Sequence, residues 1–208
     1  MHERKRIGVD LDGVVYDFVR YYDLFLSLEG HKVDPTRFDR GVLEEHMKDY
    51  YLSRFSDLHP FLWIPLYENA LNSLEELSQN FDLYFVTARN LRMKFGEKDT
   101  LARLKKDKLP CTKIFFDHDK AKIAKEFGLA YFVEDNLQNA RDIVEKTKCK
   151  VGLINWEYNQ YSDNSNLERG TIEKINRVND LPEFANFALN DSGILVRNSD
   201  LITVPGLI

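Results

Sequence analysis

IGVDLDGVVYDF, the stretch from Ile7 to Phe18, sets two aspartates at the end of an apolar run. Asp10 and Asp12 are two positions apart, and Gly13 follows them directly. Residues two apart in a strand point to the same face, so we expect the two carboxylates to lie close together. Like charges at that distance repel unless a cation or a proton holds them. The local alternative is an Asp-x-Asp-Gly turn at the surface, so the rest of the chain must distinguish the two.

The composition is that of an ordinary globular protein. The chain has 208 residues, of which 43% are hydrophobic and 30% charged, enough for one core with an insertion. The net charge of -5 disfavours binding to a nucleic-acid polymer or to an anionic membrane. Two cysteines cannot form a disulfide framework, and the sequence has no signal peptide and no apolar run of membrane length. We therefore expect a cytoplasmic protein, which could form a homodimer.

Five short apolar runs predict the strands of a doubly wound, mostly parallel sheet. They alternate with helical patterns, which is the arrangement of βαβ units. The expected strands cover residues 7–11, 83–87, 113–116, 131–134 and 150–155. The expected helices outside the first crossover cover residues 70–78, 98–106, 121–127, 137–146 and 181–189. The predicted fold class is α/β and Rossmann-like.

The long separation between the first two strands predicts an inserted subdomain. A βαβ unit needs about 30 residues, and Asp10 and Thr87 are much further apart than that. The surplus, 16–65, is rich in aromatic residues and has a helical pattern. We interpret it as a small helical cap over the carboxyl end of the first strand. The predicted core is then 1–15 with 66–189, and 190–208 form a tail that could dock as a strand, contact another subunit or stay mobile.

Polar side chains gather where the predicted strands end. In open α/β sheets, ligands bind beyond the carboxyl ends of the strands. The residues at these ends are Asp10, Asp12, Thr87, Arg89, Lys120, Glu134 and Asp135. Acids that offer only oxygen ligands suit Mg²⁺, whereas cationic and hydroxyl side chains suit a phosphoryl group. The joint arrangement predicts a site for phosphate chemistry and outweighs the surface-turn alternative.

The motifs at these strand ends resemble, in order and spacing, those of the haloacid dehalogenase superfamily of phosphotransferases. DLDGV resembles the first motif, VTAR the second, HDKAKIAKEFG the lysine motif and FVEDN the acidic fourth motif. The resemblance covers the chain up to about Leu189, and the insertion stands where that superfamily places a helical cap of its first type. The short cap, the TAR triplet and the VEDN end look most like the 5′-nucleotidase and 5′(3′)-deoxyribonucleotidase branch.

The resemblance implies roles for the four acids. Asp10 would be the nucleophile that forms an aspartyl-phosphate, and Asp12 would be the general acid–base. Mg²⁺ would be bound by Asp10, Asp135 and the backbone carbonyl of Asp12, with Glu134 in the same shell or connected through a water molecule. Glu134 and Asp135 could exchange these roles, because the motif allows either acid to reach the ion.

The resemblance also implies the groups that would bind phosphate. Thr87 would hydrogen-bond a phosphate oxygen, and Lys120 would neutralise charge on the nucleophile and the phosphoryl group. Lys113 and Lys122 compete with Lys120 for that role. Arg89 would be a second contact to phosphate or substrate, and its alternative is an ordinary surface residue in the first turn of a helix.

Substrate selectivity is expected to come from the cap, because the sheet edge contacts little more than the phosphate. Tyr16 and Phe18 follow the catalytic loop directly, and Tyr21 lies in the same expected helix. We expect Phe18, with Tyr16 or Tyr21, to line the leaving-group side, where stacking on a base contributes about 1–3 kcal/mol. A second aromatic group is expected to be mainly core: Tyr50, Tyr51 and Phe55.

The expected function is therefore a Mg²⁺-dependent phosphomonoester hydrolase, best matched by a (deoxy)nucleoside 5′-monophosphate as substrate. Another small phosphate ester, such as a sugar phosphate, stays open, and the acidic charge balance disfavours a polynucleotide end. A phospho-accepting signalling receiver is disfavoured because its accepting aspartate lies on a later strand. A catalytically silent module on the same fold is expected to have lost a motif acid, and none is missing here.

Overall fold

A six-stranded sheet in which every described pairing is parallel forms the centre of the protein, in the order β3-β2-β1-β4-β5-β6. The computed structural model describes residues 4–42, 44–89, 93–160 and 174–194. The strands are β1 (Arg6–Val9), β2 (Asp82–Thr87), β3 (Lys113–Phe116), β4 (Tyr131–Glu134), β5 (Lys150–Ile154) and β6 (Ile175–Val178). The predicted α/β fold with a parallel, doubly wound sheet is confirmed.

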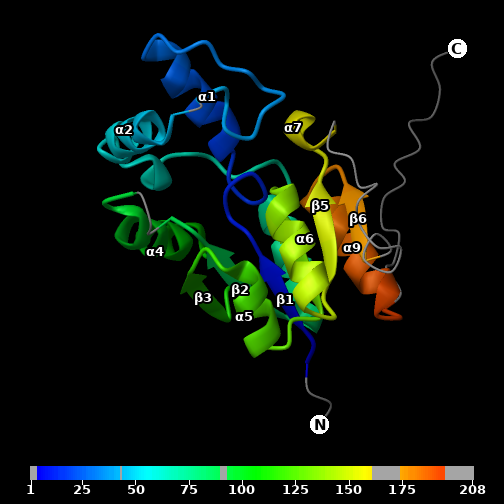
Figure 1. Ribbon diagram of the computed structural model, residues 1–208. Helices are drawn as coiled ribbons and strands as arrows, with labels where there is room; N and C mark the ends of the chain where they lie inside the picture. Colours follow the sequence, from blue (N-terminus) through cyan, green and yellow to red (C-terminus); the bar gives the residue numbers. More distant parts are fainter. Residues whose placement is uncertain (1–3, 43, 90–92, 161–173, 195–208) are drawn as a thin grey trace, which may run out of the picture.

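Helices cover both faces of the sheet, which explains why its central strands are apolar throughout. One face packs against α5 (Lys120–Glu126) and α6 (Leu137–Lys146), which also contact each other. The other face packs against α3 (Ala70–Asn80) and α9 (Leu181–Asp191), again in mutual contact. Figure 1 shows α5 and α6 in front of the sheet and α9 behind it. In the described part of the chain, no helix is long and apolar enough to cross a membrane.

The inserted segment leaves and re-enters the core at adjacent points. Tyr16 bridges to Leu66, and the Tyr67 amide donates to the backbone oxygen of Val15. Between these points lie α1 (Phe18–Leu28), α2 (Glu45–Ser56) and the 3₁₀ helix η1 (Pro60–Leu62). They lie beyond the carboxyl end of β1 (Figure 1). The insertion is therefore positioned to cover the edge where the motif residues gather.

Aromatic side chains form the interior of this insertion. Phe18 and Tyr22 on α1 both contact Phe55 on α2, with ring centroids 5.7 and 5.3 Å apart. Tyr51 is also buried, but Tyr50 is 47% exposed, so the prediction that Tyr50 belongs to the core is wrong. Tyr50 lies on the outer side of α2, where a half-exposed aromatic side chain is ordinary.

Two features differ from the expected elements. The chain forms β6 at the edge of the sheet, where no strand was expected. Its sequence, INRV, places two polar residues at its centre, and an edge strand with a single neighbour tolerates them. Separately, β1 ends at Val9 and not at Leu11, because the chain turns after Asp10, with the Val15 and Tyr16 amides donating to the Leu11 oxygen. Residues 195–208 of the expected tail lie outside the described residues.

Gly152 on β5 offers a test of the packing between the sheet and α9. A Cβ atom at this position would overlap the ring of Phe184, which is fully buried. Gly152→Ala should therefore lower the free energy of unfolding by about 1–3 kcal/mol, the usual cost of overpacking. Urea denaturation measures this directly. Adding Phe184→Leu should recover part of the loss, because the pair shares one space, and strictly additive effects would contradict the packing described here.

Candidate active site

The loop after β1 places its two aspartates through a tight turn around Gly13. The Asp10 amide donates to the Val133 oxygen of β4 at 3.1 Å, which continues the sheet by one bond. Gly13 has φ +76°, and a Cβ atom there would overlap the carboxylate of Asp135. Trp156 donates from its Nε1 atom to the Gly13 oxygen at 2.9 Å. Glycine is required here both for the backbone conformation and for the close approach of Asp135.

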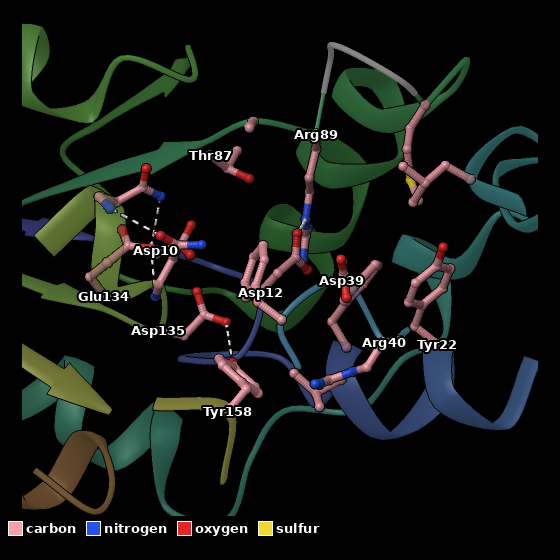
Figure 2. A pocket seen from close by; sticks show the side chains of 18 of the residues that line it. Asp10, Asp12, Tyr22, Asp39, Arg40, Thr87, Arg89, Glu134, Asp135 and Tyr158 are labelled. Carbon is pink, nitrogen blue, oxygen red and sulfur yellow. Dashed lines mark hydrogen bonds and ion pairs between the residues drawn. The ribbon is translucent and has the colours of Figure 1, made fainter. Parts of the chain in front are cut away.

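Three carboxylates meet in the interior at the carboxyl ends of β1 and β4. Oxygens of Asp10, Glu134 and Asp135 lie within 4.8 Å of one another, and all three residues are buried. The Lys120 Nζ atom lies 2.8 Å from both Asp10 Oδ1 and Glu134 Oε2. Figure 2 shows the three acids converging from neighbouring elements. The sequence therefore placed these four residues together correctly.

The two competing lysines lie elsewhere. Lys122 pairs with Asp117 at 3.4 Å on the surface. The Lys113 ammonium group lies over the Phe127 ring, 4.4 Å from its centroid. Of the three lysines considered, Lys120 is the one that contacts the acids.

The acids differ in how many of their oxygens the protein already engages. Glu134 uses both: Oε2 accepts from Lys120, and Oε1 accepts from the Asn136 amide at 3.2 Å and from Asn139 Nδ2 at 3.1 Å. Among the described residues, hydrogen bonds and ion pairs reach one carboxylate oxygen of Asp10, from Lys120, and one of Asp135, from Tyr158 at 2.7 Å. Asp10 and Asp135 thus retain an oxygen for a cation.

Burial dominates the electrostatics of this cluster. It raises the pKa of Asp10 from its ordinary 3.8 to about 7; Lys120 opposes this shift, and Glu134 and Asp12 add to it. Burial also raises the pKa of Asp135 well above its ordinary value, with further contributions from Asp10 and Glu134. For Lys120, burial favours the neutral form, but Asp10 and Glu134 outweigh it and the pKa is raised. Three carboxylates share the single positive charge of Lys120, and an oxygen-liganded divalent cation fits such a cluster.

Asp12 stands apart from the three clustered carboxylates. Its carboxylate receives both arms of the Arg89 guanidinium, from Nη2 at 2.7 Å and from Nε at 3.0 Å. Arg89 is buried, so the alternative of a surface residue is wrong. The structure therefore brings Arg89 to the site, where its partner is the carboxylate of Asp12.

Thr87 ends β2 at the same edge. The residue is 1% exposed, and its Oγ1 atom has no hydrogen-bond partner among the described residues. In Figure 2 the hydroxyl points toward the space between Asp10 and Arg89. Buried hydroxyl groups are rarely left without a partner, and a ligand oxygen in this space would supply one.

A cavity of about 500 Å³ opens over these residues and extends under the insertion. Its acidic end contains Asp10, Asp12, Glu134 and Asp135, and its far end is mainly apolar. The residues that line the far end include Phe18, Val19, Tyr22, Val42, Leu52, Phe61 and Met93, with Asp39, Arg40 and Lys48 as polar members. The volume is in the usual range for a small-molecule site.

The structure corrects two of the three expected cap contacts. Phe18 lines the cavity. Tyr16 is buried in the core, where its hydroxyl donates to Asp107 at 3.2 Å. Tyr21 packs against Trp63, with ring centroids 5.5 Å apart. Neither belongs to the cavity lining, and Tyr22 takes their place. Tyr22 follows Phe18 by four residues and lies on the same face of α1. Tyr21 is rotated by about 100° from Tyr22 around the helix axis.

Sequence reasoning assigned no role to the segment after β5. There, α7 (Glu157–Gln160) brings Tyr158 to the Asp135 carboxylate, and Asn159 Nδ2 donates to the Asp135 backbone oxygen at 2.7 Å. Arg40 lies over the Tyr158 ring, 4.7 Å from its centroid. The sequence signal that could have indicated this role is the place of Tyr158 and Asn159 shortly after a predicted strand, because residues there lie at the edge where ligands bind in such sheets.

Comparison with known proteins places the fold. No family model matches the chain. A nucleotidase from Clostridium acetobutylicum is 28% identical over 193 residues, which cover 80% of this chain and 88% of that protein. A haloacid dehalogenase-like hydrolase from Xanthomonas campestris has a TM-score of 0.58 at 11% identity, covering 92% of this chain and 97% of that one. A haloacid dehalogenase-type hydrolase from Bacillus subtilis, whose structure contains magnesium, has a TM-score of 0.53 at 15% identity. That comparison covers 89% of this chain and 99% of the other. The fold that the resemblance of the four motifs implies is confirmed.

Magnesium should stabilise the protein more at high pH than at low pH. The raised pKa of Asp10 means that, without metal, the folded state binds more protons than the unfolded state between about pH 4 and 7. Metal-free stability should therefore fall as the pH rises through this window. A divalent cation replaces these protons, so saturating Mg²⁺ should raise Tm by about 5 °C or more at pH 8 and by much less at pH 5. Thermal melts with EDTA or Mg²⁺ test this, and an increment that does not vary with pH would contradict it.

Tyr158→Phe should weaken magnesium binding without unfolding the protein. The substitution keeps the ring under Arg40 and removes the hydroxyl that orients Asp135. Losing a partner of a metal ligand typically costs about 10–100-fold in metal affinity. Mg²⁺ titration by calorimetry measures the change, with Tyr84→Phe on β2 as the matched control, since Tyr84 packs against Phe115 and Phe127. Unchanged affinity in Tyr158→Phe would remove the assigned role.

Proposed function

We propose that this chain, which has the haloacid dehalogenase fold, is a Mg²⁺-dependent phosphomonoester hydrolase that forms an aspartyl-phosphate on Asp10. The observation that carries the proposal is the contact between Asp10 and Lys120, 2.8 Å long and buried among further acids at a cavity. A carboxylate in that position is paired with a cation yet faces a space that a substrate can enter. The Thr87 hydroxyl on the same cavity, which has no hydrogen-bond partner within the described part of the chain, supports it.

The reaction would proceed in two displacements. In the first, an oxygen of Asp10 attacks phosphorus, the bond from phosphorus to the leaving oxygen breaks, and Asp12 gives that oxygen a proton. In the second, Asp12 takes a proton from a water molecule whose oxygen attacks phosphorus. The bond between Asp10 and phosphorus then breaks, and inorganic phosphate leaves. Both carboxyl groups return to their initial protonation states.

Two further side chains would stabilise the transferring group. Lys120 balances the charge of Asp10 and of the phosphoryl oxygens, while its second contact to Glu134 fixes its position. Thr87 donates its hydroxyl hydrogen to a phosphoryl oxygen. Glu134 therefore acts by holding Lys120 and the start of α6, since its own oxygens are engaged.

Magnesium would be held by Asp10, Asp135 and the backbone carbonyl of Asp12. When bound, it neutralises the clustered carboxylates and the charge that builds on the phosphoryl oxygens. Tyr158 and Asn159 fix Asp135 from its far side. The ligand assignment gives Asp135 the direct contact and Glu134 a supporting one.

The substrate would be a nucleoside monophosphate, with deoxyribose or ribose. Phe18, Tyr22 and Phe61 give the far end of the cavity an aromatic, mostly apolar wall, which suits a base better than the hydroxyl groups of a sugar phosphate. The nucleotidase name of the Clostridium acetobutylicum relative supports the same class. Formation of a homodimer and location in the cytoplasm remain predictions.

Replacing the two catalytic acids gives the most direct activity test. Asp10→Asn should show no measurable phosphatase turnover, because the amide is no nucleophile. Asp12→Asn should lose about 10²–10⁴-fold in kcat on an alkyl phosphate, the usual contribution of a general acid–base. Asp142→Asn, at a partly exposed carboxylate on α6 that pairs with Lys146, should retain full activity. Near-native turnover by Asp10→Asn, or full wild-type activity in EDTA, would overturn the proposed reaction.

Phe18→Leu tests the nucleotide assignment. The substitution should raise KM for a preferred nucleoside monophosphate by about 10-fold, the loss of 1–2 kcal/mol of stacking, and leave hydrolysis of methyl phosphate nearly unchanged. Phe55→Leu is the matched control, because Phe55 contacts Phe18 in the same cluster but does not line the cavity. Equal losses on both substrates would make Phe18 purely structural, and a best substrate without a base would overturn the nucleotidase proposal.

A further inference from the structure

We propose that Arg89 is a positioning residue for the general acid–base Asp12, and is no ligand of the substrate phosphate. This inference rests on the proposed function, because it concerns the group that protonates the leaving oxygen. It replaces the expectation that Arg89 contributes a phosphate contact. The observations that support it are the fork between the two side chains and the way in which Arg89 itself is fixed.

The contact between Arg89 and Asp12 is a two-point fork. Nη2 donates to Oδ1 at 2.7 Å and Nε donates to Oδ2 at 3.0 Å. Such bidentate pairs fix the plane of the carboxylate as well as its distance. Each carboxylate oxygen has two lone-pair sites, so the fork leaves one on each oxygen. The proton that Asp12 transfers can occupy a remaining site while the pair stays intact.

Arg89 is held on its other sides as well. Its third nitrogen, Nη1, donates to Thr100 Oγ1 at 3.1 Å. The guanidinium lies 4.0 Å from the Phe61 ring centroid and 5.0 Å from that of Tyr16. The Arg89 side chain is 2% exposed. Each of its three nitrogens donates to Asp12 or to Thr100. These contacts use three of the five N–H donors, and a two-point contact from Nε and Nη2 to a phosphate would require both charge-assisted bonds to Asp12 to break.

The backbone of Arg89 is equally constrained. Helix α4 (Gly96–Asp107) begins against it, and a Cβ atom on Gly96 would overlap the Arg89 carbonyl oxygen. Gly96 thus lets α4 approach closely enough for Thr100 to reach the guanidinium. Phe61 belongs to η1 in the insertion, so Arg89 also connects the position of Asp12 to the docking of the cap.

A positioning role and a phosphate-binding role predict different dependence on the leaving group. An acid–base matters in the first displacement only when the leaving oxygen needs a proton. Benzyl phosphate releases an alkoxide that needs one, whereas 4-nitrophenyl phosphate releases a stable phenolate of similar size. The ratio kcat/KM reports on the steps through formation of the aspartyl-phosphate, so it isolates this first displacement from the second.

The experiment compares kcat/KM for both esters in wild type, Arg89→Met and Asp12→Asn, with Mg²⁺ present. Arg89→Met should lower the value for benzyl phosphate by about 100-fold, within the usual range of acid–base catalysis, and that for 4-nitrophenyl phosphate by less than about 10-fold. Asp12→Asn should show the same pattern. Equal losses on both esters, together with weaker inhibition by inorganic phosphate, would overturn the inference in favour of a phosphate ligand.

Arg103→Met is the matched control for removing a buried arginine. Arg103 lies 5.5 Å from the same Tyr16 ring, pairs with Asp107 and donates to the Leu62 oxygen. It does not line the cavity, so its loss should affect both esters equally. If Arg89→Met fails to melt cooperatively, Arg89→Lys provides the comparison, because it keeps the charge but loses the two-point contact to Asp12. Its loss in kcat/KM should be smaller, and again larger for benzyl phosphate than for 4-nitrophenyl phosphate.

The outcomes separate this inference from the proposed function. A wild-type protein that hydrolyses neither ester, nor any other phosphomonoester, contradicts the proposed function itself. A wild-type protein that hydrolyses both, with Arg89 variants that lose activity equally on each, contradicts only the role given to Arg89.

Discussion

Asp10, Glu134 and Asp135 bring three carboxylates into one buried space around the ammonium group of Lys120. Charges so placed repel and lack hydration, so the surrounding structure must both force and compensate their approach. The sheet forces it, because β1 and β4 are parallel neighbours whose carboxyl ends coincide. Lys120, Tyr158 and Asn139 compensate part of the charge, and the remaining deficit is what a divalent cation would fill.

The insertion depends on the same edge. Its two ends leave and enter the core beside the loop that carries Asp10 and Asp12. On the core side, α4 contacts η1. There His59 Nδ1 lies 2.8 Å from Asp99 Oδ2, and Arg103 donates to the Leu62 oxygen at 2.9 Å. Phe61 then covers Arg89, which holds Asp12. Cap docking and the orientation of Asp12, the proposed acid–base, are therefore parts of one contact network.

Much of this arrangement could be predicted from the sequence, because it follows from strand ends. Buried parallel strands are continuous apolar runs, and residues directly after them meet at one edge, which located Asp10, Thr87, Lys120 and Asp135. Contacts that depend on helix rotation or loop path could not be predicted. Tyr22 and not Tyr21 faces the cavity because of its angle on α1. Arg89 turns to Asp12 because Thr100 and Phe61 hold it. The contact of Tyr158 with Asp135 depends on the path of the chain after β5.

Covalent capture at Asp10 tests the central claim most directly. The full-length protein is mixed with Mg²⁺ and a hydrolysed phosphate ester, and borohydride is added during turnover to reduce any acyl phosphate. Mass spectrometry of the peptides that contain residues 7–18 and 131–139 then locates the reduced side chain. The account predicts reduction at Asp10, dependent on substrate and magnesium. Turnover that leaves Asp10 unmodified, or reduction at Asp12 or Asp135 instead, would contradict it.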